Sequence, residues 1–348
     1  MKKDKVIILR SGLLGDTVVA IPALAAIRAK HPKARIEYIY EHSKLAKFIK
    51  APHVIKPFGI VDHFSSFKGQ ANCLETILSR LWLFIRLFLL RPNAVYILES
   101  PPSRSKVRFA KAVCKNHAVY YENALANPPL LKQKIHKSLL DITKSNESDS
   151  LLRSLSNRIP PSKKIKIWIK ENGLSPNRPL LIVAPGTNMQ AKDWGQDNYI
   201  KTLNLVHRTI QCNVLLIGGP HDREICQRIA VSTENSLNAA GHFDIGETFA
   251  LLKEGTIFFG NDSGPMHMAA LMNITCVAVF SARDVPQKWE PMGENHQIFR
   301  YDPPCSGCML KTCNTIGHPC LTSISPDEVS RSLVNLLHSM DTPKTNTK

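Results

Sequence analysis

The sequence lacks the signatures of several common nucleotide-binding sites. No Asp-x-Asp motif occurs, so a diphosphate chelated through a metal ion is not indicated and we expect no catalytic metal. The turn after the first apolar run contains Gly12 and Gly15 but not the third glycine of the dinucleotide fingerprint. Asp16, which starts the following helix, would also repel a pyrophosphate. These absences disfavour a nicotinamide-dependent dehydrogenase.

Long uninterrupted apolar runs are also missing. Arg10 ends the N-terminal run Val6–Leu9 after four residues, whereas a signal peptide needs about 7–15. The longest other run, Leu81–Leu90, contains Arg86 and falls far short of the ~20 residues of a membrane span. We therefore expect a cytoplasmic protein whose nine cysteines do not form disulfides. Leu81–Leu90 is interpreted as a buried helix or, alternatively, as one that docks on a bilayer surface.

Acidic residues are scarce in the first half of the chain. Residues 1–172 carry 31 Lys and Arg against 12 Asp and Glu, whereas residues 173–348 carry 14 against 16. The excess predicts an anionic partner: nucleic acid, an acidic membrane surface or a phosphorylated acceptor. Few aromatics and no recognisable binding module disfavour nucleic acid; charge that serves only solubility is the remaining alternative. The candidate cations are Arg80, Arg86, Arg91, Arg104, Lys106, Arg108 and Lys111.

Apolar strand-like runs alternate with helical patterns along the chain. This alternation predicts an α/β fold of parallel sheets wrapped by helices, and 348 residues suit two domains of about 150 each. The breaker segment Asn157–Ser162 separates two Rossmann-like domains, 1–160 and 161–348, which we expect to face each other across a cleft. The expected strands are Lys5–Leu9, Arg35–Tyr40, Ala94–Glu99, Leu180–Ala184, Asn213–Ile217, Thr256–Gly260 and Thr275–Phe280, and the expected helices include Asp16–Lys30, Ser43–Lys50, Ser103–Cys114 and Asn198–Thr209.

The last helix carries its own start signal. Ser325 and Glu328 form a capping box, and Pro326 fits the first helical position. This helix could pack back on the N-terminal domain, and we expect the polar tail after Met340 to be disordered.

Asp16 stands near the carboxyl end of the first expected strand. Ligands in doubly wound sheets bind at this edge, and a carboxylate there is suited to act as a general base. Alternatively, Asp16 only caps the helix that follows. The spacing alone favours neither interpretation.

Two further strand ends predict a phosphate site in the second half. After Thr256–Gly260, a glycine-containing turn leads into a small-residue helix whose free N–H groups suit a diphosphate. The candidates there are Asp262, Ser263, Gly264 and His267, although His267 alone could equally be a core histidine. After Leu180–Ala184, Thr187 and Lys192 offer a hydroxyl and a cation. Without a metal ion, Lys192 and helix N-termini would meet the charge of a leaving diphosphate.

Together these residues resemble glycosyltransferase family 9, the ADP-heptose:lipopolysaccharide heptosyltransferases. The resemblance covers nearly the whole chain and is most specific at Gly260–His267. Its other parts are Ile8–Asp16, Pro22–Leu24, His136, Pro185–Thr187 with Lys192 and Trp194, Gly218–Pro220, Trp289–Gly293 and the segment from Cys305 to Pro326.

The resemblance implies a GT-B fold and an inverting, metal-independent transfer of heptose from ADP-heptose to the lipopolysaccharide inner core, without a cofactor. It implies that Asp16 is the base and that Thr187, Lys192, Asp262–Gly264 and His267 hold the nucleotide diphosphate. The excess of cations in residues 1–172 further predicts that the N-terminal domain binds a phosphorylated glycolipid of the lipid A-core type at the cytoplasmic face of the inner membrane. Residues 65–70 and 99–104 depart from the family pattern, so a relative that glycosylates a protein or another glycan is the alternative.

Four cysteines lie within sixteen residues, at Cys305, Cys308, Cys313 and Cys320. In a reducing compartment such a cluster raises a zinc or iron–sulfur interpretation. The spacing fits neither the standard zinc ribbon nor the ferredoxin pattern. We expect a structural role and no catalytic one, and the spacing leaves metal binding open.

Overall fold

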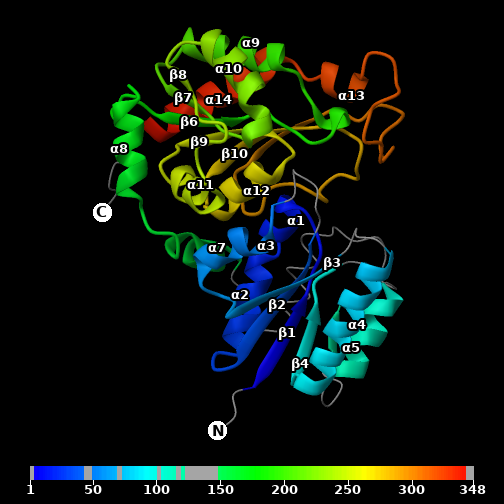
Figure 1. Ribbon diagram of the computed structural model, residues 1–348. Coiled ribbons are helices and arrows are strands. Elements are labelled where there is room, and N and C mark those ends of the chain that lie inside the picture. The colour runs from blue at the N-terminus through cyan, green and yellow to red at the C-terminus, as the bar shows by residue number, and fades with distance from the viewer. Residues whose placement is uncertain are drawn as a thin grey trace. The chain divides into compact units, whose positions relative to one another are not determined.

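The structure is a computed structural model that describes residues 4–42, 49–68, 73–99, 103–114, 119–121 and 148–341. The chain divides into two compact units, Met1–Arg158 and Ile159–Lys348 (Figure 1). The division falls inside the breaker segment Asn157–Ser162. The predicted helix Ser43–Lys50 lies mostly outside the described residues, as do His136 and the tail after residue 341.

The N-terminal unit is built on a five-stranded parallel sheet of order β3-β2-β1-β4-β5. Its strands are β1 (Lys5–Leu9), β2 (Arg35–His42), β3 (His63–Lys68), β4 (Ala94–Ile97) and β5 (Val119–Tyr121). Its helices are α1 (Leu14–Val18), α2 (Ile21–Lys30), α3 (Ala51–Ile55), the 3₁₀ turn η1 (Lys56–Phe58), α4 (Cys73–Leu90), α5 (Arg104–Val113) and α7 (Ser148–Asn157).

Both faces of this sheet are covered. Side chains alternate between the faces of a strand, and Ile7, Leu9 and Val95 pack with residues of α4 and α5 in one core. Figure 1 shows α4 and α5 together on one side of the sheet and α2 on the other. Burial on both faces explains why the sequence reads as continuous apolar runs and not as an alternating pattern.

Two helix predictions differ from the structure. The predicted helix Asp16–Lys30 is two helices, because Pro22 lies in the first turn of α2 and has no N–H to bond back to α1. The run Leu81–Leu90, interpreted as a buried helix, belongs to the longer helix α4 and is buried on one side only.

The C-terminal unit is built on a six-stranded parallel sheet of order β11-β10-β9-β6-β7-β8. Its strands are β6 (Leu180–Ala184), β7 (Asn213–Leu216), β8 (Ser236–Asn238), β9 (Ile257–Asn261), β10 (Thr275–Phe280) and β11 (Gln297–Arg300). Its helices are α8 (Lys163–Glu171), η3 (Gln190–Lys192), α9 (Gln196–His207), η4 (Pro220–Asp222), α10 (Arg223–Val231), α11 (Ile245–Leu252), α12 (Gly264–Leu271), α13 (Pro319–Thr322) and α14 (Pro326–Asp341).

The last helix, α14, packs against α9 and β10 of the C-terminal unit. Val329, Leu333 and Leu337 belong to the core of that unit. The N–H of Asp327 donates to Ser325 Oγ at 3.2 Å, so the serine caps the helix start as the sequence indicates.

Each sheet has one point where the strand order reverses. In the N-terminal sheet the reversal lies between β1 and β4, and in the C-terminal sheet it lies between β6 and β9. Loops that leave the carboxyl ends of such strands diverge to opposite faces of the sheet, which opens a crevice for ligands. The predicted α/β class with two Rossmann-like domains is confirmed, and the topology places Asp16, Thr187 and Asp262 near these points.

Candidate functional site

An ion pair joins two of the predicted phosphate-binding loops. Lys192 Nζ donates to Asp262 Oδ2 at 2.6 Å and approaches the Asp262 carbonyl oxygen at 3.5 Å. The two side chains are only 13% and 8% exposed. Asn261 Nδ2 also donates to the carbonyl oxygen of Pro185 at 2.7 Å. These contacts, which span 70 and 76 residues of sequence, hold the loop after β6 and the end of β9 together.

The turn between β9 and α12 contains polar atoms that the described residues do not satisfy. Ser263 is the N-cap of α12, yet its Oγ makes no capping hydrogen bond. Within the described part of the chain, Ser263 Oγ, Asn261 Oδ1 and Ser281 Oγ are buried without a hydrogen-bond partner. Buried polar atoms in folded proteins nearly always have a partner. Three orphaned atoms at neighbouring strand ends therefore indicate a place where a polar ligand binds.

His267 lies in the first turn of α12 and is only 2% exposed. The centre of its ring lies 6.2 Å from that of Trp289. This burial agrees with the core interpretation, although the residue stays next to the phosphate-binding turn.

Asp284, which the sequence did not single out, holds Trp289 in place. The Trp289 indole donates to Asp284 Oδ2 at 3.0 Å, and Lys288 Nζ donates to Oδ1 at 2.9 Å. Burial alone would raise the pKa of Asp284, but the hydrogen bond and charge of Lys288, with further N–H donors, lower this pKa below its ordinary value. Asp284 is therefore an ionised carboxylate that anchors the Trp289 indole, whose ring lies near that of His267.

The remaining predicted residues of this region fall into two groups. Thr187 is half-buried in the loop after β6, where its Oγ1 accepts from the N–H of Met189 at 3.3 Å. Trp194, by contrast, is a core residue. Its indole donates to the Ile324 carbonyl oxygen at 3.3 Å, and its ring contacts that of Tyr199.

A second carboxylate, Asp222, lies at the same sheet edge. Gly219 N–H donates to Asp222 Oδ2 at 2.8 Å. A Cβ on Gly186 would lie 2.3 Å from Asp222 Oδ1, and a Cβ on Gly218 would lie 2.7 Å from Oδ2. In the position that it occupies, the Asp222 carboxylate leaves no room for a Cβ at either glycine. The sequence signal was Gly218–Pro220, a glycine turn that leads directly to this aspartate.

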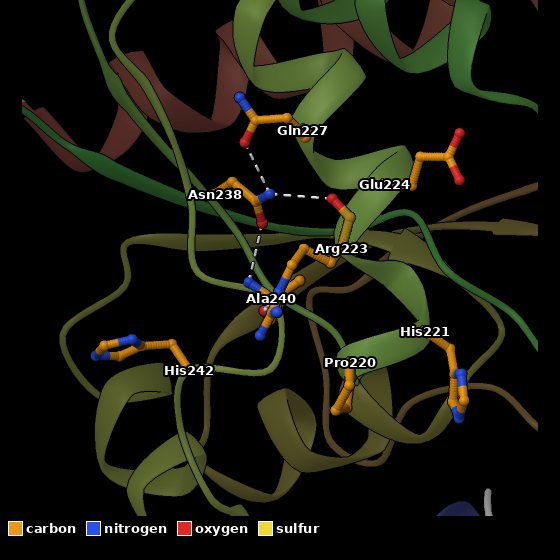
Figure 2. A pocket seen from close by; sticks show the side chains of 8 residues that line it. All are labelled: Pro220, His221, Arg223, Glu224, Gln227, Asn238, Ala240 and His242. Carbon is orange, nitrogen blue, oxygen red and sulfur yellow. Dashed lines mark hydrogen bonds between the residues drawn. The ribbon is translucent and has the colours of Figure 1, made fainter.

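A hollow of about 780 Å³ lies where β7 and β8 end. Figure 2 shows Asn238 in its lining, where it donates to the Arg223 carbonyl oxygen at 3.0 Å and to Gln227 Oε1 at 3.1 Å, and accepts from the N–H of Ala240. These bonds fix the wall of the hollow. Its lining is completed by Pro220, His221, Glu224 and His242.

In the N-terminal unit, Asp16 lies in α1 just beyond the end of β1. Leu13 N–H donates to Asp16 Oδ2 at 2.9 Å, which is the capping contact. A Cβ on Gly12 would lie 2.4 Å from Asp16 Cβ, so the turn needs glycine. The side chain is half-buried. The structure thus gives Asp16 its capping role and leaves it beside the crevice where a base would act.

Glu99 is a further carboxylate at this edge, just after β4. It accepts from the N–H of Ser11 at 3.0 Å, and Lys106 Nζ donates to its Oε2 at 2.7 Å. Arg86 is likewise paired, with the buried Glu37. Two of the seven candidate cations are therefore neutralised within the unit. The sequence did not predict either pairing: Arg86 and Glu37 lie 49 residues apart in the chain, whereas Glu99 and Lys106 are only seven apart.

The four clustered cysteines line one narrow cavity together with His318. Cys305 and Cys308 are exposed, and Cys320 is buried. Burial raises the pKa of the Cys320 thiol, and the neighbouring cysteines raise it further. In the described ranges, no three His, Cys, Asp or Glu side chains form a group that could hold a metal ion.

The chain is similar to known proteins over most of its length. The family model for glycosyltransferase family 9 (heptosyltransferase) matches residues 105–317. Lipooligosaccharide heptosyltransferase 2 of Campylobacter jejuni subsp. jejuni serotype O:2 is 26% identical over 336 residues, which cover 93% of this chain and 95% of that protein. None of the described helices is long and apolar enough to cross a membrane.

Solved structures share the fold. The family 9 glycosyl transferase of Veillonella parvula DSM 2008 superposes with a TM-score of 0.76 at 17% identity, covering 97% of this chain and 99% of that one. The E. coli ADP-heptose lps heptosyltransferase II gives 0.67 at 18% identity, covering 97% and 100%. The fold is therefore GT-B. Because the family model spans more than half of the chain, the dehydrogenase interpretation falls away, and the protein belongs to glycosyltransferase family 9.

Proposed function

We propose that this enzyme transfers a heptose from ADP-heptose to the inner core of a lipopolysaccharide, with inversion at the anomeric carbon and without a metal ion or other cofactor. The observation that carries the proposal is the buried Lys192–Asp262 pair beside the unpartnered Asn261 Oδ1 and Ser263 Oγ at the β6/β9 switch point, with Ser281 Oγ at the end of the neighbouring β10. The names of the C. jejuni and E. coli proteins support the choice of heptose, of an ADP-linked donor and of a lipopolysaccharide-type acceptor.

The donor half of the proposal uses the C-terminal unit. The diphosphate would lie over the start of α12, where backbone N–H groups and the helix dipole favour an anion. Ser263, Thr187 and Lys192 would contact its oxygens, with Asp262 orienting the lysine. As the bond to the sugar breaks, negative charge grows on the departing ADP, and Lys192 stabilises it. The hollow beyond Asp222 has the volume to take the nucleoside.

The acceptor half uses the N-terminal unit. Asp16 would take the proton from the acceptor hydroxyl while that oxygen attacks the anomeric carbon from the side opposite ADP, which inverts the configuration. Phosphate groups of a lipid A-core acceptor explain the basic character of this half. In this proposal the enzyme works at the cytoplasmic face of the inner membrane.

Two quantities test the proposal: the affinity for ADP, measured by calorimetry, and the rate of heptose transfer. Each is measured with and without EDTA. Activity should survive EDTA, and Lys192→Ala should weaken ADP binding by about tenfold or more, since it removes a charge-assisted contact. Lys201→Ala, on the exposed side of α9, is the matched control and should bind normally. Loss of activity in EDTA that Mg²⁺ or Mn²⁺ restores would contradict the metal-independent mechanism.

A folding defect must be separated from a binding defect. Lys192→Ala leaves Asp262 as a buried unpaired charge, which itself destabilises the protein. The double variant Lys192→Ala/Asp262→Asn removes that charge and should recover stability without recovering ADP affinity. The acceptor is tested by mass analysis of lipopolysaccharide from a deletion strain, which should lack heptose; an unchanged lipopolysaccharide would favour a protein or another glycan.

A further inference from the structure

Helix α4 is apolar on both of its sides. Leu83 and Leu87 are 5% and 0% exposed and pack in the core between α4 and the sheet. The opposite side carries seven large apolar side chains that are between 43% and 77% exposed: Ile77, Leu78, Leu81, Trp82, Ile85, Phe88 and Leu89. At about 100° per residue, these seven fall within one arc of roughly 140°. We call them the outer face of α4.

This concentration is not ordinary surface composition. In the described part of the chain, seven of the fifteen large apolar side chains that are exposed lie on this one helix. Single exposed apolar residues need no explanation, but a contiguous exposed apolar patch marks an interaction site. A helix that is apolar all round is normally covered on all sides. We therefore expect the outer face of α4 to bind a partner with an apolar surface.

The border of the outer face is cationic. Helix α5 packs against α4, and the two helices together carry six cations and one acid, Glu75. Two of the six, Arg86 and Lys106, are paired with Glu37 and Glu99, which leaves four for the border. Glu75 is itself paired with Lys68 at 2.9 Å. The guanidinium groups of Arg80 and Arg91 lie 5.9 and 5.4 Å from the ring centres of Phe67 and Phe88.

An apolar helix face with cations along its border has the chemistry needed to bind an anionic membrane surface. A bilayer with anionic lipids offers acyl chains for the stripe and negative headgroups for the border. A second copy of this chain fits less well, because a symmetric contact would bring the same arginines towards one another. Helix α5 lies on the same side of the sheet as α4 (Figure 1), and two of its cations, Arg104 and Arg108, are exposed.

We propose that the outer face of α4 inserts into the boundary between headgroups and acyl chains of an anionic membrane, with the helix lying along the surface. The inference deepens the proposed function, because it names the surface by which the enzyme reaches a lipid-linked acceptor. Insertion of the apolar face can be distinguished from attraction by charge alone through its response to salt. Salt screens the cations, but the contribution of the buried apolar side chains remains.

The first test is vesicle flotation with phosphatidylglycerol–phosphatidylethanolamine vesicles over a salt series. Leu89→Glu and Trp82→Glu should each lower the partition coefficient by about tenfold or more, because each removes a large apolar side chain from the membrane. Val231→Glu, at a side chain 73% exposed on α10, is the matched control and should bind as the wild type does. Wild-type binding should fall with salt to a residual level that the two α4 variants lack.

The second test places the helix directly. Lipids brominated in their acyl chains should quench the fluorescence of Trp82, and Trp82→Phe should remove that quenching. Equal flotation of Leu89→Glu and wild type, or no quenching of Trp82, would overturn the proposal. It would also be overturned by sedimentation showing a dimer that Leu89→Glu dissociates, without vesicle binding.

The membrane-binding result can be distinguished from the result of the test of the proposed function. Leu89→Glu should keep the wild-type melting temperature and ADP affinity, because Leu89 is 77% exposed and belongs to the other unit. Loss of flotation with intact ADP binding would therefore support the membrane surface alone. Failure of the wild-type enzyme to transfer heptose would count against the function and leave the flotation result standing.

Discussion

The two units of this enzyme share the same glycine turn at the end of their first strand, but they differ in the charged side chains beside it. In each unit, the first strand of the sheet ends in a glycine turn that makes room for a carboxylate: Gly12 faces Asp16, and Gly186 faces Asp222. In the C-terminal unit a second acid, Asp262, is buried and paired with Lys192. In the N-terminal unit Asp16 caps a helix and is half-buried. Topology thus decides where polar groups gather, and the neighbouring charges decide their chemistry.

The units also differ in what they present to solvent. The N-terminal half has a large excess of cations and the C-terminal half does not. Part of that excess is cancelled locally, by Glu37 on Arg86 and by Glu99 on Lys106. Other exposed cations lie around the outer face of α4. A net charge counted along the sequence therefore overstates the charge available to a ligand.

The largest expected effect separates the two roles of Asp16. The amide oxygen of asparagine can accept the Leu13 N–H that Asp16 accepts from, but the amide cannot take a proton from a hydroxyl. Asp16→Asn should therefore lower kcat by about 10²-fold or more and leave the melting temperature and ADP affinity close to wild type. Asp197→Asn, in the exposed first turn of α9, is the control. Near-normal turnover of Asp16→Asn would reduce the residue to a helix cap.

An effect of intermediate size is expected when Gly12 and Gly186, the two glycines that face a carboxylate, are replaced. Gly186→Ala should weaken ADP binding on the order of tenfold, because overpacking against Asp222 costs about 1–3 kcal/mol. Gly12→Ala should lower kcat and spare ADP binding. Gly219→Ala is the control, because its Cβ would be 3.8 Å from Asp222 Oδ2, an ordinary contact. If both test variants changed the same kinetic constant, the division of labour between the units would be wrong.

The smallest expected effect concerns the acid anchor Asp284. Its folded-state pKa is lowered, so its ionisation contributes stability that is present above the unfolded pKa of about 3.9. That contribution is lost as the pH falls through the folded-state pKa. Asp284→Asn should lower the free energy of unfolding at pH 7, and the difference from wild type should shrink below about pH 4. A difference that stays constant down to pH 2 would show that Asp284 acts by shape and not by charge.

Several parts of this protein follow from local sequence. The strands Lys5–Leu9, Leu180–Ala184 and Thr275–Phe280 have the bounds that the sequence predicts, because burial on both faces demands an apolar run within each strand. The two-domain α/β class follows from the alternation of strands and helices. The rule that ligands bind at strand ends led us to choose the loops that carry Asp16, Thr187 and Asp262 as candidate sites.

Other features depend on the tertiary structure, because they join residues that are distant in the chain. Strand order set the β6/β9 switch point and so brought Lys192 to Asp262. The close approach of Asp222 to Gly186 depends on how two loops pack. Most clearly, the sequence of α4 is apolar all round and predicted burial; only the packing of Leu83 and Leu87 decided which side is covered and left Trp82 and Leu89 facing outward. A periodic pattern reports how apolar a helix is, whereas the neighbours that the fold supplies determine which of its faces meets solvent.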